Sequence, residues 1–303
     1  MDIYLPIAGQ SVNALLIVVL GFLVGLLSGM FGVGGGFLTT PLLIFYGIPP
    51  TVAVASATTQ ITGASVSGAM VHMRRGGVDL KMGGVMIFGG LAGSFVGAAL
   101  FRLLQSTGQI DVVIGLLYVL ILFWIGGLML VDSLKSLGYI TVPDAGQPRP
   151  RHNRWVASLP YRWRFHASGL YISPLAPLAL GFLAGMLTVF LGIGGGFILV
   201  PAMIYLLGMP ARVVIGTSLI MILAVSATTT MVHALTTRAV DIVLAALLLV
   251  GGVIGAQYGA LLTLRIKPDL LRLALSVIIL LVGLRMFLGL FWHPDEIFSI
   301  EYL

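Results

Sequence analysis

A short glycine-rich motif occurs twice in the chain, and each copy interrupts a long apolar stretch. Residues 32–37 read Gly-Val-Gly-Gly-Gly-Phe, and residues 192–197 read Gly-Ile-Gly-Gly-Gly-Phe. The flanks repeat as well, because 11 of the 21 positions from Gly21 to Pro41 are identical to those from Gly181 to Pro201. Each glycine costs a helix about 1 kcal/mol relative to alanine. The motif therefore predicts a helix break at the same place in two related halves.

The composition is that of a membrane protein. Hydrophobic residues make up 59% of the chain and charged residues 9%, against about 25% charged in soluble domains. Continuous apolar stretches long enough to span a bilayer as helices recur along the chain, and they lack the alternation of barrel strands. We therefore expect an all-α polytopic membrane protein. The net charge of +6 resides between the apolar stretches, so it indicates membrane orientation and not nucleic-acid binding.

The apolar segments form two similar sets of five. The first set covers 12–34, 36–46, 52–73, 82–103 and 109–131, and the second covers 173–193, 196–207, 213–235, 241–263 and 270–292. We divide the chain into a first transmembrane repeat (1–133), a linker (134–172) and a second repeat (173–303). The linker is rich in Arg and Pro, and we expect it to be cytoplasmic, with a short surface helix around Trp155–Trp163.

The positions of Lys and Arg favour inverted repeats. If the chain turns back at each glycine motif, 13 of the 16 Lys and Arg fall on one side of the membrane. If each motif lies inside a single broken span, the split is 11 to 5. The positive-inside rule favours the first arrangement. We expect a protein of the plasma (inner) membrane with both termini outside.

A second glycine pattern lies in the fourth segment of each repeat. Gly89, Gly90, Gly93 and Gly97 correspond to Gly251, Gly252, Gly255 and Gly259. This spacing forms a ridge of small residues that lets helix backbones approach closely in lipid. Close packing is the favoured interpretation, and a sliding surface between moving parts is the alternative.

The short segments after the two motifs predict an anion site. They are too short to span the membrane, so each begins inside it with free backbone N–H groups and a positive dipole end. Two such N-termini related by inversion would converge on one anion. The backbone groups expected to bind it belong to Gly34, Gly35, Gly36, Phe37, Gly194, Gly195, Gly196 and Phe197. In the alternative interpretation the glycines only relieve crowding.

The third segment of each repeat carries many hydroxyl groups, which can donate hydrogen bonds to an oxyanion. Thr58, Gln60, Thr217 and Ser218 follow the short segments closely, and they are the side chains expected to contact the substrate. The Ser and Thr hydroxyls can instead bond the carbonyl one helical turn back and hold neighbouring helices together.

Two histidines and two aspartates occupy matching positions in the repeats, namely His72 with His233 and Asp79 with Asp241. A paired His and Asp can carry the proton of a proton-coupled cycle. Alternatively, the histidines lie in interfacial water and the aspartates begin helices. The chain has no cysteine, no metal-ligand spacing and no lysine of the phosphate-loop type. We therefore expect no enzyme activity, no metal and no cofactor.

Residues 29–37, followed by Thr40 and Pro41, resemble the signature of the TauE/SafE sulfite exporter family, which is also grouped with the 4-toluene sulfonate uptake permeases. The copy at 189–197 departs from it only in part, with Val189 in place of Gly29. The resemblance implies a secondary permease for sulfite, sulfoacetate or sulfonate anions. The expected partners are this anion, the bilayer and a coupling proton or sodium. A passive anion channel is the alternative, and a membrane scaffold is a third hypothesis.

Overall fold

The computed structural model describes residues 2–31, 36–74, 76–137, 160–262 and 268–291. In the first half the elements are β1 (Asp2–Leu5), β2 (Gln10–Asn13), α1 (Ala14–Phe31), α2 (Gly36–Phe45), α3 (Pro50–Arg74), α4 (Leu80–Ser106) and α5 (Ile110–Ser136). In the second half they are β3 (Trp163–Phe165), β4 (Leu170–Ile172), α7 (Leu175–Leu191), α8 (Gly196–Tyr205), α9 (Ala211–Val232), the π-helical turn η1 (His233–Thr237), α10 (Ile242–Leu262) and α11 (Pro268–Phe291).

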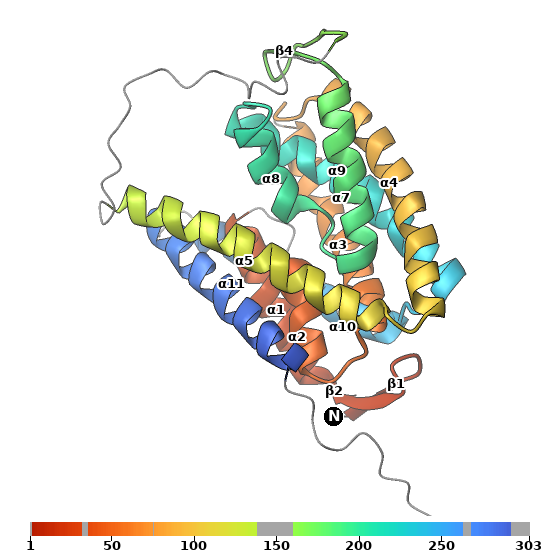
Figure 1. Ribbon diagram of the computed structural model, residues 1–303. Helices are drawn as coiled ribbons and strands as arrows, with labels where there is room; N and C mark the ends of the chain where they lie inside the picture. Colours follow the sequence, from red (N-terminus) through yellow and green to blue (C-terminus); the bar gives the residue numbers. More distant parts are fainter. Residues whose placement is uncertain (1, 32–35, 75, 138–159, 263–267, 292–303) are drawn as a thin grey trace, which may run out of the picture.

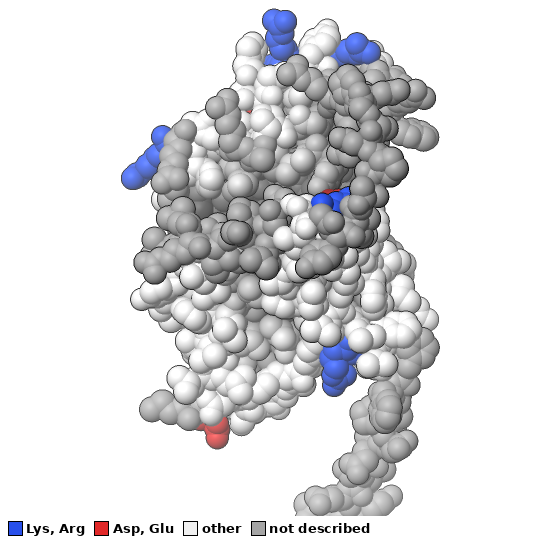
Figure 2. Space-filling model, turned by 90° about the vertical axis from the view of Figure 1, so that its left-hand side faces the viewer, with Lys and Arg blue, Asp and Glu red and all other residues white. Residues whose placement is uncertain are grey.

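Each apolar segment expected from the sequence corresponds to a helix. Among the described residues, 5 helices are long and apolar enough to cross a membrane. Charged side chains are sparse on the face shown in Figure 2, and most of its described surface is uncharged. Both glycine motifs separate two helices, since α1 and α7 end before them and α2 and α8 follow them. The prediction of an all-α polytopic membrane protein with breaks at the motifs is confirmed.

Two short β-hairpins precede α1 and α7, and the sequence analysis missed both. In the first, β1 pairs antiparallel with β2, and in the second, β3 pairs antiparallel with β4. The second hairpin lies within the segment expected to be a linker. The surface helix expected around Trp155–Trp163 is wrong at its described end, where residues 160 and 161 form a bend and Trp163 begins β3. Residues 155–159 lie outside the described residues.

The chain turns back at each glycine motif. Ile17 near the start of α1, Leu43 near the end of α2 and Val52 in the first turn of α3 lie in one buried cluster. The corresponding parts of the second half form a matching cluster, which includes Ala176 near the start of α7, Met203 near the end of α8 and Val213 in the first turn of α9. Because the start of the first helix and the end of the short helix lie together, α1–α2 and α7–α8 are re-entrant pairs.

The two repeats are inverted. Figure 1 shows β1 and β2 at one end of the molecule and β4 at the opposite end, so α1 and α7 enter from opposite sides. Each repeat also packs its first helix against the fourth helix of the other, as α1 against α10 and α7 against α4. The inverted arrangement that the charge distribution favours is therefore the observed one.

The glycine ridges lie at these two helix crossings. A Cβ atom added to Gly93 of α4 would overlap the carbonyl oxygen of Phe182 in α7, and one added to Gly255 of α10 would overlap that of Phe22 in α1. Both contacts are backbone to backbone, so only glycine allows the helices to approach this closely. Close packing, the favoured interpretation of the ridge, is confirmed.

Helices α5 and α11 form a further pair that lies across the re-entrant helices (Figure 1). A Cβ atom at Gly126 would meet the side chain of Ile279, and one at Gly283 would meet that of Leu122. These contacts are related by the inversion, which makes each residue of α5 equivalent to the residue 157 positions later in α11. In the short helices α2 and α8 the corresponding offset is 160.

Candidate substrate site at the half-helix N-termini

The N-terminal turns of α2 and α8 meet in the interior of the protein. Phe37 and Phe197, the second residue of each helix, stack face to face with ring centroids 4.3 Å apart and ring planes 5° from parallel. Both rings are buried at 2% relative exposure. The two phenylalanines are equivalent in the repeats, so their stack marks the point about which the inverted halves are arranged.

The second glycine motif has a backbone that other residues rarely adopt. Gly192, Gly194 and Gly195 have φ angles of +65°, +64° and +74°, in the left-handed region that favours glycine. A Cβ atom on Gly192 would also lie 2.6 Å from the carbonyl oxygen of Val54 in α3. The turn is therefore fixed both by its own dihedral angles and by the helix that packs against it.

Three carbonyl groups at the end of α7 have partners outside the regular helix. The N–H of Gly192 donates to the carbonyl of Thr188 at 2.8 Å. Nε2 of His233 lies 3.1 Å from the carbonyl oxygen of Val189, and the phenol of Tyr118 donates to the carbonyl of Leu191. Lipid cannot satisfy such groups, so side chains from neighbouring helices must do so.

The first N–H groups of α8, by contrast, remain available. Ile198 and Leu199 donate to the carbonyl of Gly195 at 3.1 and 2.8 Å, and Gly195 has no side chain to cap the helix. Within the described part of the chain, no acceptor is recorded for the N–H groups of Gly196 and Phe197. An anion would find these donors and the positive end of the helix dipole together. Gly34 and Gly35 of the first motif lie outside the described residues.

Gln60 stands out among the polar side chains predicted to contact the substrate. It is 5% exposed, and its Oε1 atom has no hydrogen-bond partner among the described residues. Its Nε2 atom lies against Gly252 of α10. The residue equivalent to Gln60 in the second repeat is Met221, which lies against Gly90 in the same way. The first repeat thus buries an amide where the second buries a thioether.

The three hydroxyl side chains predicted with Gln60 have hydrogen bonds inside the protein. Thr58 donates to the carbonyl of Ala55 at 2.7 Å, and Ser218 donates to that of Ile215 at 3.0 Å. The hydroxyl of Thr217 accepts a hydrogen bond from the backbone N–H of Asp79 at 3.0 Å. These contacts are the ones expected of hydroxyl groups that stabilise helices and their junctions.

Asp79 and Asp241 are equivalent and begin α4 and α10. Oδ1 of Asp79 accepts from the N–H of Met82 at 3.0 Å, and its Oδ2 accepts from the N–H and hydroxyl of Ser168 in the second hairpin. Asp241 accepts from Leu244 at 3.1 Å and from the backbone of Ile7 in the first hairpin at 3.1 Å. Each carboxylate therefore ties a hairpin of one repeat to a helix of the other.

The two histidines lie at the C-terminal ends of equivalent helices but in different surroundings. His233 is buried at 1% exposure, and its two ring nitrogens face the carbonyl of Val189 and the hydroxyl of Thr237. His72 is half-buried in the last turn of α3. Among the described residues there is no group of three or more His, Cys, Asp or Glu side chains that could hold a metal ion.

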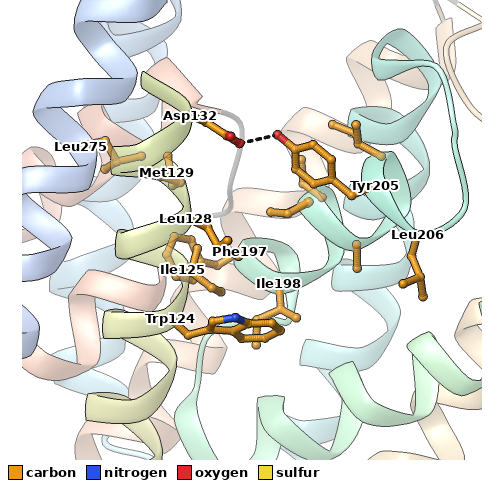
Figure 3. Close-up of a pocket in the computed structure, with 14 residues that line it drawn as sticks. Trp124, Ile125, Leu128, Met129, Asp132, Phe197, Ile198, Tyr205, Leu206 and Leu275 are labelled. Carbon is orange, nitrogen blue, oxygen red and sulfur yellow. Dashed lines mark hydrogen bonds between the residues drawn. The ribbon is translucent and has the colours of Figure 1, made fainter. Parts of the chain in front are cut away.

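A cavity of about 450 Å³ lies between α5 and α8 (Figure 3). Its walls are mainly apolar, with Trp124 of α5 at one end and Phe197 of α8 in its interior wall. At the other end, the phenol of Tyr205 donates a hydrogen bond to Oδ2 of Asp132 at 2.8 Å, across the gap between the two helices. The cavity therefore extends from the protein surface to one member of the central phenylalanine pair. The sequence analysis did not find it, because neither α5 nor the far end of α8 carries a motif.

Inverted repeats in the membrane, with two half-helix N-termini meeting at a buried centre, are an arrangement found in membrane transporters. The chain belongs to the TauE/SafE family, since the family model described as "Sulfite exporter TauE/SafE" matches residues 17–286.

Several relatives resemble the chain over nearly its whole length. The Bacillus subtilis proteins named "Probable membrane transporter protein YunE" and "Probable membrane transporter protein YjnA" are 27% and 28% identical over 88% and 89% of this chain, and over 95% and 98% of their own. A "Probable membrane transporter protein" of Xylella fastidiosa is 28% identical over 87% of this chain and 91% of its own. No solved structure gives a significant match.

Proposed function

We propose that the protein is a secondary permease of the inner membrane for a small anion of the sulfite, sulfoacetate or sulfonate class. The observation that carries this proposal is the meeting of the N-terminal turns of α2 and α8 at the stack of Phe37 on Phe197. Two positive dipole ends at one buried point favour a negative charge without a buried lysine or arginine, which would be costly in the membrane.

The backbone of the two motifs is the proposed binding surface. The uncapped N–H groups of Gly196 and Phe197 would hold the oxygen atoms of the anion from one side. The backbone N–H groups of Gly36 and Phe37, at the equivalent positions of α2, would hold it from the other. Gly34, Gly35, Gly194 and Gly195 complete the proposed set.

Gln60 is the proposed side-chain contact. Its amide is buried and only partly satisfied in the described structure, and burying a polar group without a partner is unfavourable. An oxyanion would accept a hydrogen bond from Nε2 of Gln60, because the unpartnered Oε1 is itself an acceptor and would not contact it. Thr58, Thr217 and Ser218 have hydrogen bonds within the protein. These three residues support the site through the helices that they stabilise.

The proposed mechanism is alternating access. The cavity between α5 and α8 would give the anion access to the centre from one side of the membrane. An exchange of conformation between the inverted repeats would then open the equivalent path between α11 and α2 on the other side. The linker would lie in the cytoplasm with both termini outside, and a proton or sodium would drive accumulation. His72 and His233 with Asp79 and Asp241 are the proposed proton carriers.

Flux measurements in liposomes test the proposal. We expect radiolabelled sulfite or 4-toluenesulfonate to enter protein-containing liposomes faster than empty ones, with saturation and with counterflow against an excess of unlabelled anion. Linear flux without counterflow would select the passive channel instead. Flux no greater than that of empty liposomes for sulfite, sulfoacetate and 4-toluenesulfonate would overturn the proposal.

A variant with a matched control examines the binding site. Gln60→Met introduces the residue that the second repeat carries, so it keeps the volume but removes the amide. We expect the anion concentration for half-maximal flux to rise about tenfold, because one hydrogen bond to a charged group is lost. The control Gln105→Met changes an exposed glutamine at the end of α4 and should leave the value unchanged.

A further inference from the structure

The two sides of the central phenylalanine pair differ although the repeats are equivalent. On one side, the cavity separates α5 from α8. On the other side, α2 packs against α11, the pair equivalent to α8 and α5. The residues of α2 that correspond to the cavity lining, among them Phe37 and Thr40, are buried in this structure, whereas Arg285 of α11 is exposed. The inversion identifies these residues from the residues that line the cavity.

Four lining residues have equivalents that make a different surface. Phe197, Val200, Leu128 and Leu275 all line the cavity. Their equivalents in the inverted repeat are Phe37, Thr40, Arg285 and Tyr118. Three apolar side chains are thus replaced by two hydroxyls and a guanidinium group, while the phenylalanine is kept.

The charge at the end of the cavity formed by Asp132 and Tyr205 is opposite to the charge at the equivalent place on the other side of the phenylalanine pair. Asp132 and Tyr205 close the end of the cavity between α5 and α8. The equivalents of these residues are Gly289 and Phe45, and the guanidinium of Arg285 occupies the space beside both. Its Nη1 atom lies 3.6 Å from a Cβ position on Gly289, and its Cζ atom lies 5.3 Å from the centre of the Phe45 ring. A cation therefore occupies the place where the other side has a carboxylate.

The two hydroxyl groups lie deeper, near the start of α2. Thr40 is 0% exposed, and its Oγ1 atom has no hydrogen-bond partner among the described residues. It lies beside the phenol of Tyr118, which is itself 1% exposed and donates to the carbonyl of Leu191. A fully buried hydroxyl without a well-formed hydrogen bond costs free energy unless it gains a better partner in another state.

We propose that Arg285, Thr40 and Tyr118 form an anion-binding site that becomes accessible when α2 separates from α11. Arg285 leaves the face of Phe45 and attracts the anion, and the hydroxyls of Thr40 and Tyr118 donate hydrogen bonds to its oxygens next to Phe37. The ligand is a small oxyanion, such as a sulfonate or carboxylate. This inference rests on the proposed function, because it assumes that the two sides open in turn.

Cysteine labelling tests the site without measuring transport, and the chain offers a cysteine-free background. In Thr40→Cys, we expect an anionic methanethiosulfonate (MTSES) to react about tenfold faster than a cationic one (MTSET), after correction for their rates with free thiol. Arg285→Gln in the same protein should abolish this preference. The matched control is Val200→Cys, at the equivalent position in the cavity that Asp132 also lines, which should prefer the cationic reagent. The two cysteines should react from opposite sides of the membrane.

Three results would overturn the inference. One is a Thr40 cysteine that reacts from neither side while the Val200 cysteine reacts. Another is a reagent preference that Arg285→Gln does not change. The third result applies if Thr40→Cys fails to fold, in which case the anion fluxes of Thr40→Val and Thr40→Ser are compared. Thr40→Val should raise the anion concentration for half-maximal flux about tenfold, and Thr40→Ser should not. Equal values for the two variants would overturn the inference. Absent flux in the wild-type protein would count against the proposed function, whereas the labelling preference is read independently of flux.

Discussion

Asp79 shows how one side chain holds several backbone groups together at the end of a membrane bundle. Its carboxylate caps α4 through the N–H of Met82 and fixes the second hairpin through Ser168. It is 2% exposed, and Asp241 repeats the arrangement with the first hairpin. These contacts match the alternative interpretation of the two aspartates as helix starts, and they place each carboxylate where two repeats join.

We expect Asp79→Ala to destabilise the protein by about 2 kcal/mol, because it removes a helix cap and leaves buried donors without an acceptor. The measurement is the thermal unfolding of the purified protein in detergent. Asp79→Asn keeps an oxygen for the cap and should unfold at a temperature between those of the wild type and Asp79→Ala. If Asp79 instead carries the coupling proton, Asp79→Asn would abolish proton-driven accumulation, even in a protein that unfolds near the wild-type temperature.

The sequence could not distinguish which of the four predicted polar side chains is the best candidate for contacting the substrate. Thr58, Gln60, Thr217 and Ser218 look alike as polar residues in an apolar segment. Only the packing distinguishes them. The hydroxyls of Thr58 and Ser218 reach a carbonyl of their own helix and that of Thr217 accepts from the N–H of Asp79, whereas Oε1 of Gln60 has no partner among the described residues. Arg285 lies within an apolar segment, where a charge needs a partner. The sequence could not identify this partner, because it is the ring of Phe45, which is far away in the sequence.

At the scale of elements, the helix pairs α1–α10 and α4–α7 depend on glycine at their crossings. We expect Gly93→Ala to destabilise the protein by about 1–3 kcal/mol, because the new Cβ overlaps the backbone of α7 and the helices must separate. The matched control is Gly84→Ala in the same helix, where no atom lies within 4 Å of the new Cβ. Thermal unfolding should show the control unchanged or stabilised by up to about 1 kcal/mol, since alanine favours a helix. Equal effects at the two positions would contradict the packing argument.

The hairpins are the elements that sequence reasoning did not find. Their strands have only 3 or 4 residues, which is too short for a clear alternation of apolar and polar side chains. Their turns are held by Asp241 and Asp79, which lie 234 and 89 residues away from their partners. The helices were predictable because an apolar segment of membrane-spanning length carries its own signal.

At the scale of the molecule, the open cavity and the closed α2–α11 contact predict that transport requires α5 and α8 to move relative to each other. We expect a reducible thiol cross-linker between Asp132→Cys and Tyr205→Cys to reduce anion flux by at least about tenfold, since fixing one state of a two-state cycle stops turnover. Reduction of the cross-link should restore flux to that of the uncross-linked double variant. The two single variants, treated alike, serve as controls. Unchanged flux in the cross-linked protein would show that the two helices do not move during transport.

The sequence by itself determined the membrane class, the segments that become helices, the duplication and, through the charges, the inversion of the repeats. These properties follow from hydrophobicity, glycine content and charge, which act locally along the chain. Only the tertiary structure decided that Phe37 stacks on Phe197, that a cavity between α5 and α8 reaches one side of this pair, and that Arg285 lies against Phe45 on the other side. These features depend on contacts between residues far apart in the sequence, and packing in three dimensions selects them.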